Sequence, residues 1–141
     1  PMKLDLSSLQ SALASFERAL KFSQKIIDDK SFSEDEKEVI KAGVIQNFEF
    51  SYELCWKFMK RWLEQNYSES FTAGITRKQL FRYAAENLLI EDYDAWMSFH
   101  ELRNKTSHTY DREVAEEIFE ATGNFFHHSR LFYKAIEARN D

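Results

Sequence analysis

At the beginning of the chain, apolar positions recur with the period of an α-helix. Apolar residues recur three, four or seven positions apart, which places them on one stripe of a helix. The stripe consists of Leu6, Leu9, Leu13, Phe16, Leu20 and Ile27. The pattern predicts a first helix over residues 7–29, with this stripe packed against a partner helix.

A second and longer helix is predicted to begin after Ser33 and to run to about Gln65. Ser33 and Glu36 form a capping box, in which the serine hydroxyl accepts a hydrogen bond from a free backbone amide and the glutamate reaches back. Gly43 is the expected position of a bend. The residues expected on the buried face are Ile45, Phe48, Tyr52, Cys55, Met59 and Trp62. Its length makes this helix the predicted spine of the fold.

Three further helices are predicted after a loop over residues 66–75, which shows no apolar period. Thr76 and Gln79 form a second capping box, and one more helix begins near Asp92. Asp111 can cap the last helix. The residues expected to face inward are Leu80, Phe81, Ala84, Leu88, Leu89, Trp96, Phe99, Val114, Ile118, Phe125, Phe132 and Ile136.

The composition favours the same fold class. Three Gly and one Pro among 141 residues supply few of the tight turns that a sheet protein requires. Aromatic residues make up 16% of the chain, so the core is expected to be rich in rings. We therefore predict an all-α fold, an antiparallel bundle of about five helices, with residues 1–141 forming a single domain.

Charge and cysteine content narrow the functional classes. A net charge of −5 disfavours a broad electrostatic surface for nucleic acid, so any RNA contact is expected to be local. The lone Cys55 has no partner for an internal disulfide. The chain shows neither a secretion signal nor an apolar stretch of about 20 residues. We expect a cytoplasmic protein with no membrane contact.

The segment from Arg103 to Tyr110 departs from the helical pattern, because it has no apolar residue expected to face inward and is rich in poor helix formers. On an unbroken helix Arg103 and His108 would point roughly 140° apart. Their side chains converge only if the helix breaks, and residues 106–109 are the expected break. If that stretch is extended, His108 and Tyr110 point to the same side. All three side chains would then share one pocket.

These side chains suit the cleavage of a phosphodiester. The planar guanidinium of Arg103 can hold a phosphate, and a histidine with an ordinary pKa of about 6.5 can give and take a proton. In the alternative interpretation, Arg103 is a cation that stabilises a helix C-terminus, while His108 and Tyr110 are ordinary loop residues. The residues by themselves leave both interpretations open.

The spacing of Arg103, His108 and Tyr110 resembles the R-X4-H-X-Y motif of HEPN-domain proteins, and the whole chain looks like a HepT-type toxin. It is also similar to the family of nucleotidyltransferase substrate-binding proteins. The resemblance covers nearly the whole chain, with the motif between the penultimate and the last helix. It implies a metal-independent RNase that acts as a dimer and is encoded beside a minimal nucleotidyltransferase such as MntA.

The resemblance also implies a role for each residue of the motif. Arg103 would hold the scissile phosphate, His108 would act as general acid or base, and Asn104 would orient one of them. Tyr110 would accept AMP from the partner transferase. No metal and no cofactor is implied. The acidic residues that flank the motif, Glu101 among them, disfavour tight RNA binding by this chain alone.

Three other polar patterns are interpreted as structural. The D-x-D sequence at residues 92–94 has no preceding Gly-Ser pair and no strand to carry it, so it is expected to start a helix. His127 and His128 are adjacent, so they diverge on a helix and cannot bind zinc together. His100 lies one turn before Arg103 but is interpreted as a surface residue.

The second helix carries more aromatic residues than one face can hold. They are Phe48, Phe50, Tyr52, Trp56, Phe58 and Trp62. Part of the set is expected to point outward, and exposed aromatic stripes are typical of protein interfaces. We predict a homodimer or higher oligomer, in which two copies of the motif face each other across a two-fold axis.

Two functions are therefore open. The first is a HEPN-type RNase, the toxin of a toxin–antitoxin pair, which an MntA-like nucleotidyltransferase silences by transferring AMP. The second is a non-catalytic, substrate-binding subunit of a two-component nucleotidyltransferase. The first function requires Arg103 and His108, whereas the second requires only a surface for the transferase.

Overall fold

The computed structural model describes residues 3–141, and in that range the chain forms α-helices and one 3₁₀ turn without any strand. The elements are α1 (Ser7–Ile26), α2 (Glu34–Asn66), α3 (Glu69–Thr72), α4 (Arg77–Glu86), α5 (Tyr93–Lys105), η1 (Thr106–His108) and α6 (Arg112–Ala138). The prediction of an all-α helical bundle is confirmed. None of these helices combines the length and apolarity that a membrane crossing needs.

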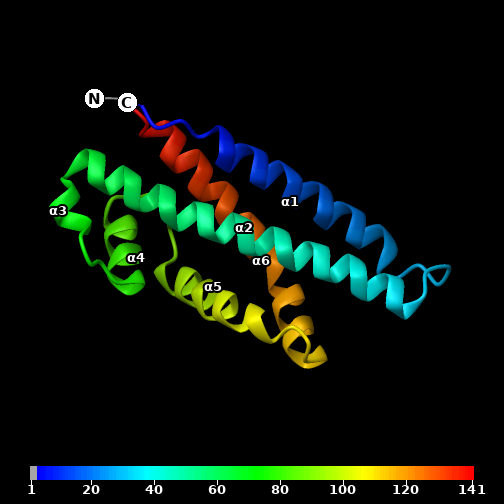
Figure 1. The fold of residues 1–141 in the computed structure, drawn as a ribbon. Helices are drawn as coiled ribbons and strands as arrows, with labels where there is room; N and C mark the ends of the chain where they lie inside the picture. The colour runs from blue at the N-terminus through cyan, green and yellow to red at the C-terminus, as the bar shows by residue number, and fades with distance from the viewer. Residues whose placement is uncertain (1–2) are drawn as a thin grey trace.

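Helix α2 is the spine of the bundle. It packs against each of the five other α-helices, with α1 antiparallel to it and α6 alongside both (Figure 1). The predicted capping box fixes where α2 begins, because the Glu36 amide donates to Ser33 Oγ (3.1 Å) and the Ser33 amide donates to Glu36 Oε1 (2.8 Å). The segment before α1 and the segment after α6 meet at one end of the bundle, where the side chain of Asn140 bonds both backbone groups of Leu4 (2.8 and 2.9 Å).

The predicted starts of the other helices are also confirmed. The backbone amides of Gln79, Ala95 and Glu113 donate to the side chains of Thr76, Asp92 and Asp111 over 3.1, 3.0 and 2.9 Å. Asp92 therefore caps α5, as the interpretation of the D-x-D sequence required.

The sequence patterns missed or misplaced two local features. Helix α3 lies inside the predicted loop, and four residues are too few to show a helical period. Helix α1 ends at Ile26 and not at residue 29, because the Asp29 carboxylate bonds the amide and hydroxyl of Ser31 and so favours a turn. Ile26 and not Ile27 is consequently the buried residue at this end.

Rings fill the centre of the bundle. Phe125 of α6 contacts Phe48 of α2 and Phe99 of α5 edge to face, with ring centroids 4.9 and 5.1 Å apart. Phe16 of α1 and Trp96 of α5 lie 5.8 and 5.7 Å from the same ring. One aromatic side chain thus joins four helices, and edge-to-face pairs add to the stability that burial provides.

Part of the aromatic set of α2 points outward, as predicted, but it does not form an exposed stripe. Trp62, Phe58, Tyr52 and Phe48 are buried in the core, Trp56 is partly buried, and Phe50 alone of the set is exposed (58%). The reason is that α2 is enclosed by helices on several sides, so its rings fill more than one buried face. The homodimer stays a prediction, without the support of an exposed ring surface.

Leu88, expected to face inward, instead occupies a strained exposed position after α4. The Leu89 amide bonds the Ala84 carbonyl (2.9 Å) across the helix end, which requires Leu88 to adopt a positive φ of 61°. Its side chain is 67% exposed, so little burial offsets the strain.

Replacing Leu88 with glycine should therefore stabilise the protein by about 0.5–1 kcal/mol, because glycine adopts positive φ without a Cβ clash. Urea unfolding at equilibrium measures the change. The control is Glu86→Gly, in an exposed and helical position of α4, which should lower the stability. A Leu88→Gly protein less stable than the wild type would contradict the argument.

Candidate functional site

The motif segment breaks the helix where the sequence predicts, but by a tight turn and not by an extended stretch. Helix α5 continues through Arg103 to Lys105, tightens into η1 and turns at Thr109, which has φ −72° and ψ −6°. The Asp111 amide then bonds the His108 carbonyl (3.0 Å) before α6 begins. The expectation of an extended segment is therefore wrong.

Thr106 holds the turn together. Its hydroxyl donates to the Arg103 carbonyl (2.6 Å) and accepts a hydrogen bond from Arg103 Nη1 (2.7 Å). Thr106 is also buried, so the segment does contain an inward residue, although a polar one. A threonine that satisfies one of the last carbonyls of a helix is a reason for the chain to turn here.

Two carboxylates of α2 hold the Arg103 guanidinium. Its Nη1 lies 3.6 Å from Glu49 Oε2, and its Nε lies 3.9 Å from Glu53 Oε2. All three side chains are about one-third exposed, so solvent weakens the attraction without removing it. In the free protein, acidic neighbours therefore partly neutralise the predicted phosphate-binding residue.

Arg103 and Asn104 line an open pocket of about 350 Å³ between α2, α4 and α5. The rest of its lining is Tyr52, Glu53, Arg77, His100 and Ser107. His108 and Tyr110 do not line it. The structure therefore divides the four predicted site residues into two pairs, one inside this pocket and one outside.

His100, interpreted as a surface residue, belongs to the pocket. Burial, with a contribution from the positive charge of Arg77, lowers the pKa of His100 below its ordinary value. Burial also raises the pKa of Tyr52, so its hydroxyl stays protonated. We assign the 2.8 Å contact as a bond from the Tyr52 hydroxyl to His100 Nδ1, since a neutral imidazole can accept there.

Arg77 is the second residue that the sequence did not indicate. It is the first residue of α4, and its guanidinium stacks on the Trp56 ring, 3.5 Å from the centroid. Burial lowers its pKa, and its Nε is buried without a hydrogen-bond partner. The capping box at Thr76 locates residue 77 on α4, but only the packing of α4 on α2 brings it beside Arg103.

The other predicted pair lies on the outside of the turn. His108 Nδ1 is 3.1 Å from the Tyr110 hydroxyl, and the two rings meet edge to face. Tyr110 is 84% exposed, which leaves its hydroxyl open to an approaching protein. The turn thus brings the two rings together as expected, although not through the geometry expected.

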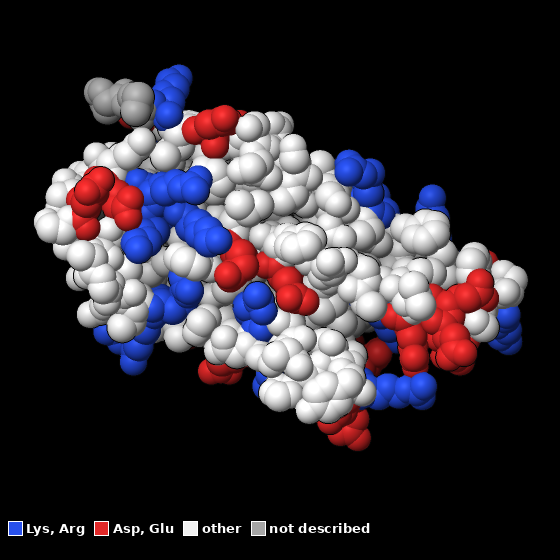
Figure 2. Space-filling model, viewed as in Figure 1, with Lys and Arg blue, Asp and Glu red and all other residues white. Residues whose placement is uncertain are grey.

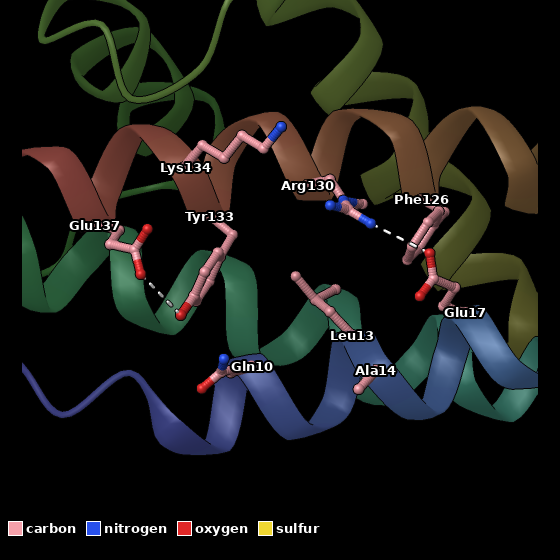
Figure 3. A pocket seen from close by; sticks show the side chains of 9 residues that line it. All are labelled: Gln10, Leu13, Ala14, Glu17, Phe126, Arg130, Tyr133, Lys134 and Glu137. Atoms are coloured by element: carbon pink, nitrogen blue, oxygen red, sulfur yellow. Dashed lines mark hydrogen bonds and ion pairs between the residues drawn. The ribbon is translucent and has the colours of Figure 1, made fainter.

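A groove of about 260 Å³ between α1 and α6 is a less suitable site (Figure 3). Its Arg130 is paired with Glu17 (3.2 Å), and the Tyr133 hydroxyl donates to Glu137 (3.3 Å). The groove contains none of the motif residues, and two pairs of its polar groups already bond each other. The pocket at Arg103 is therefore the candidate site.

An all-α bundle that carries the R-X4-H-X-Y residues at the turn before its last helix is what we expect of the nucleotidyltransferase substrate-binding class of proteins. Residues 4–138 match the family described as nucleotidyltransferase substrate binding protein like, and the chain belongs to this family. The resemblance noted from the motif is confirmed at this level.

Particular relatives come from two bacteria. The chain is 33% identical over 143 residues to the probable ribonuclease HepT of Haemophilus influenzae, covering 98% of this chain and 95% of the relative. It is 30% identical to a solved structure from the same species, described as a substrate binding domain of a nucleotidyltransferase (TM-score 0.89; 94% and 99% covered). A Thermus thermophilus structure shares the fold, at 24% identity and TM-score 0.57, with 88% and 97% covered.

The lowered pKa of His100 makes a testable contribution to stability. Just below its ordinary value of 6.5, the unfolded chain binds more protons at this residue than the folded protein does, so stability falls as the pH drops below 6.5. His100→Gln keeps an acceptor for Tyr52 but does not titrate. Its free energy of unfolding should depend less on pH between about 5 and 6.5. Urea unfolding at several pH values tests this.

His127→Gln, an exposed change on α6, serves as the control for removing a surface imidazole. An unchanged pH dependence in His100→Gln would show that burial of His100 is not linked to stability.

Proposed function

We propose that this protein is an RNase of a toxin–antitoxin pair, in which Arg103 binds the scissile phosphate and His108 transfers a proton. The observation that carries the proposal is the 3.1 Å contact between His108 and Tyr110 on an exposed turn directly after the helix of Arg103. The name of the Haemophilus influenzae relative, a probable ribonuclease, supports it.

The proposed chemistry is the metal-independent cleavage of RNA. The 2′-hydroxyl oxygen attacks the adjacent phosphorus and the bond to the 5′ oxygen breaks, which leaves a 2′,3′-cyclic phosphate and a 5′-hydroxyl. A neutral His108 takes the proton of the 2′-hydroxyl, or a charged His108 gives a proton to the departing oxygen. Arg103 stabilises the charge that develops on the phosphate, and Asn104 beside it orients the substrate.

A homodimer is part of the proposal. Within one chain Arg103 lines the pocket while His108 lies outside it, so the two groups face different surroundings. A two-fold interface at the η1 turn would bring the motif of a second copy to the site. RNA phosphate would compete with Glu49 and Glu53 for Arg103.

The partner is proposed to be a minimal nucleotidyltransferase that modifies Tyr110. The tyrosine oxygen attacks the α-phosphorus of ATP, pyrophosphate leaves, and the hydroxyl proton is released. The attached AMP would remove the hydroxyl that now contacts His108 and place an anion beside it. Such a modification would block the proton transfer by His108.

A second candidate is a non-catalytic subunit that presents substrate to the transferase. It is favoured by the ion pairs of Arg103 with Glu49 and Glu53, which give the arginine a structural role in the free protein. This candidate predicts binding to the transferase that survives the loss of His108.

If the RNase proposal is right, the purified protein should cut single-stranded RNA in excess EDTA, because Arg103 and His108 supply the charge and the proton. His108→Ala should lower the rate about 10²–10⁴-fold. Arg103→Lys should also be inactive, since an ammonium cannot replace the planar fork. Gel analysis of labelled RNA measures the rate. His127→Ala is the matched control and should cut normally. Full activity of His108→Ala would refute the mechanism.

Incubation with the partner transferase and ATP should add one or more AMP groups to the peptide that contains Tyr110. Tyr110→Phe should prevent the increase in mass, because the ring remains but the accepting oxygen is gone. Tyr67→Phe is the control, since Tyr67 is also exposed (53%) but lies at the end of α2. Mass spectrometry of the digested protein shows which peptide carries AMP. Modification that persists in Tyr110→Phe would place the acceptor elsewhere.

A further inference from the structure

Unpaired cations gather on one part of the surface. Six side chains of α2 and α4 form no ion pair within the described residues 3–141, whereas those of several other Lys and Arg residues are paired. The six are Lys57, Lys60, Arg61, Arg77, Lys78 and Arg82. Figure 2 shows blue side chains over the C-terminal half of α2. The acidic chain therefore carries a local positive surface.

Two carboxylates lie close to this surface, but neither forms an ion pair with its cations. Glu53 accepts a hydrogen bond from the Trp56 indole (2.8 Å) and faces Arg103. Glu64 accepts a hydrogen bond from the Thr72 hydroxyl (3.0 Å). Cations outnumber carboxylates in the pocket that Glu64 lines, by three to one, so this part of the surface has a net positive charge.

Three of these cations lie near aromatic rings, and one of them is stacked closely. The Lys57 ammonium lies 5.8 Å from the Trp56 ring, and the Arg61 guanidinium lies 4.9 Å from the Phe58 ring. Arg77 stacks on Trp56 at 3.5 Å. A side chain that is already ordered loses less entropy when it binds a ligand.

The cations of α2 line a second pocket, which lies next to the candidate site. Trp56, Lys57, Lys60, Arg61 and Glu64 line a shallow pocket of about 230 Å³. The Trp56–Arg77 stack joins it to the pocket of Arg103, since Trp56 lines the first and Arg77 lines the second. The two depressions and the wall between them thus form a track in which cations outnumber the two carboxylates, Glu64 and Glu53, that also line it; we call it the basic track.

The inner end of the track has two guanidinium Nε atoms without a hydrogen bond. The Nε of Arg77 is buried and has no hydrogen-bond partner, and the buried Nε of Arg103 has only the ion-pair contact with Glu53 at 3.9 Å. They belong to two different helices and line one pocket. Buried donors of this kind normally have partners, and a phosphate oxygen is an acceptor suited to guanidinium groups.

We infer that the basic track, from Arg61 along α2 to Arg77, binds the sugar–phosphate backbone of single-stranded RNA and directs it to Arg103. The inference rests on the proposed RNase function for the use of the bound strand, but the binding itself does not require cleavage. Spaced cations along a groove suit a repeating phosphate chain. An acidic protein partner is less favoured, because the residues lining the two pockets include no exposed large apolar side chain to anchor it.

The test measures binding of a fluorescent 2′-O-methyl RNA of about 12 nucleotides, which cannot be cleaved through its 2′ oxygens, by anisotropy at several salt concentrations. The track variant Lys57→Gln/Lys60→Gln/Arg61→Gln is compared with the wild type. The control variant Arg18→Gln/Lys25→Gln/Lys30→Gln removes three exposed and unpaired cations of α1 and the loop after it. Both variants change the net charge equally.

The track variant should bind more weakly, and its slope of log K against log salt should be smaller by about 2, because each phosphate contact contributes about 0.7 for a single strand. The control should keep the wild-type slope. Arg77→Gln should weaken binding further. Thermal unfolding confirms that each variant is folded.

Three results would overturn the inference. They are a wild type that does not bind the RNA at low salt, an equal loss in the control variant, and a track variant that keeps RNA binding while it loses binding to the transferase. The last result would assign the surface to a protein partner. If the track variant loses binding but the wild type does not cut unmodified RNA, the inference stands and the proposed catalytic function fails.

Discussion

The enclosure of α2 by the other helices is the constraint on which the rest of the structure depends. Because neighbouring helices bury its other faces, the charged residues of α2 from Glu49 to Glu64 share one remaining stripe. Glu49 and Glu53 occupy the part of this stripe beside Arg103, and the cations from Lys57 to Arg61 occupy the part beyond Trp56. The helix that organises the core therefore also organises the charges of the site.

Local physics made much of the fold predictable. Ser33, Thr76, Asp92 and Asp111 each cap a helix through an oxygen that bonds an amide two or three residues ahead, and this can be seen in the sequence without knowing the tertiary structure. The four-residue α3 was not predictable in this way, because one turn contains no repeat. Leu88 was misplaced since apolar spacing does not reveal a residue that the end of a helix forces into a positive φ.

Sequence reasoning found the motif residues of the candidate site but not the residues that surround Arg103. The spacing of Arg103, His108 and Tyr110 indicated the chemistry, and Thr106 explains why the chain turns between them. The surroundings of Arg103 depend on contacts across long sequence separations, such as Glu49 of α2 and the Trp56–Arg77 stack. Such contacts follow from how helices pack, so no motif within a single helix could predict them.

The bonds between Asn140 and Leu4 bear on chain connectivity. They hold the segment before α1 beside the segment after α6, at the same end of the bundle, although 136 positions separate Leu4 and Asn140 in sequence. A short peptide bridge across that gap would join the ends without moving a helix, and the chain could instead be opened in the polar turn between α1 and α2. Circular permutation of this kind would change the order in which the helices are synthesised while the packing around Phe125 stayed the same.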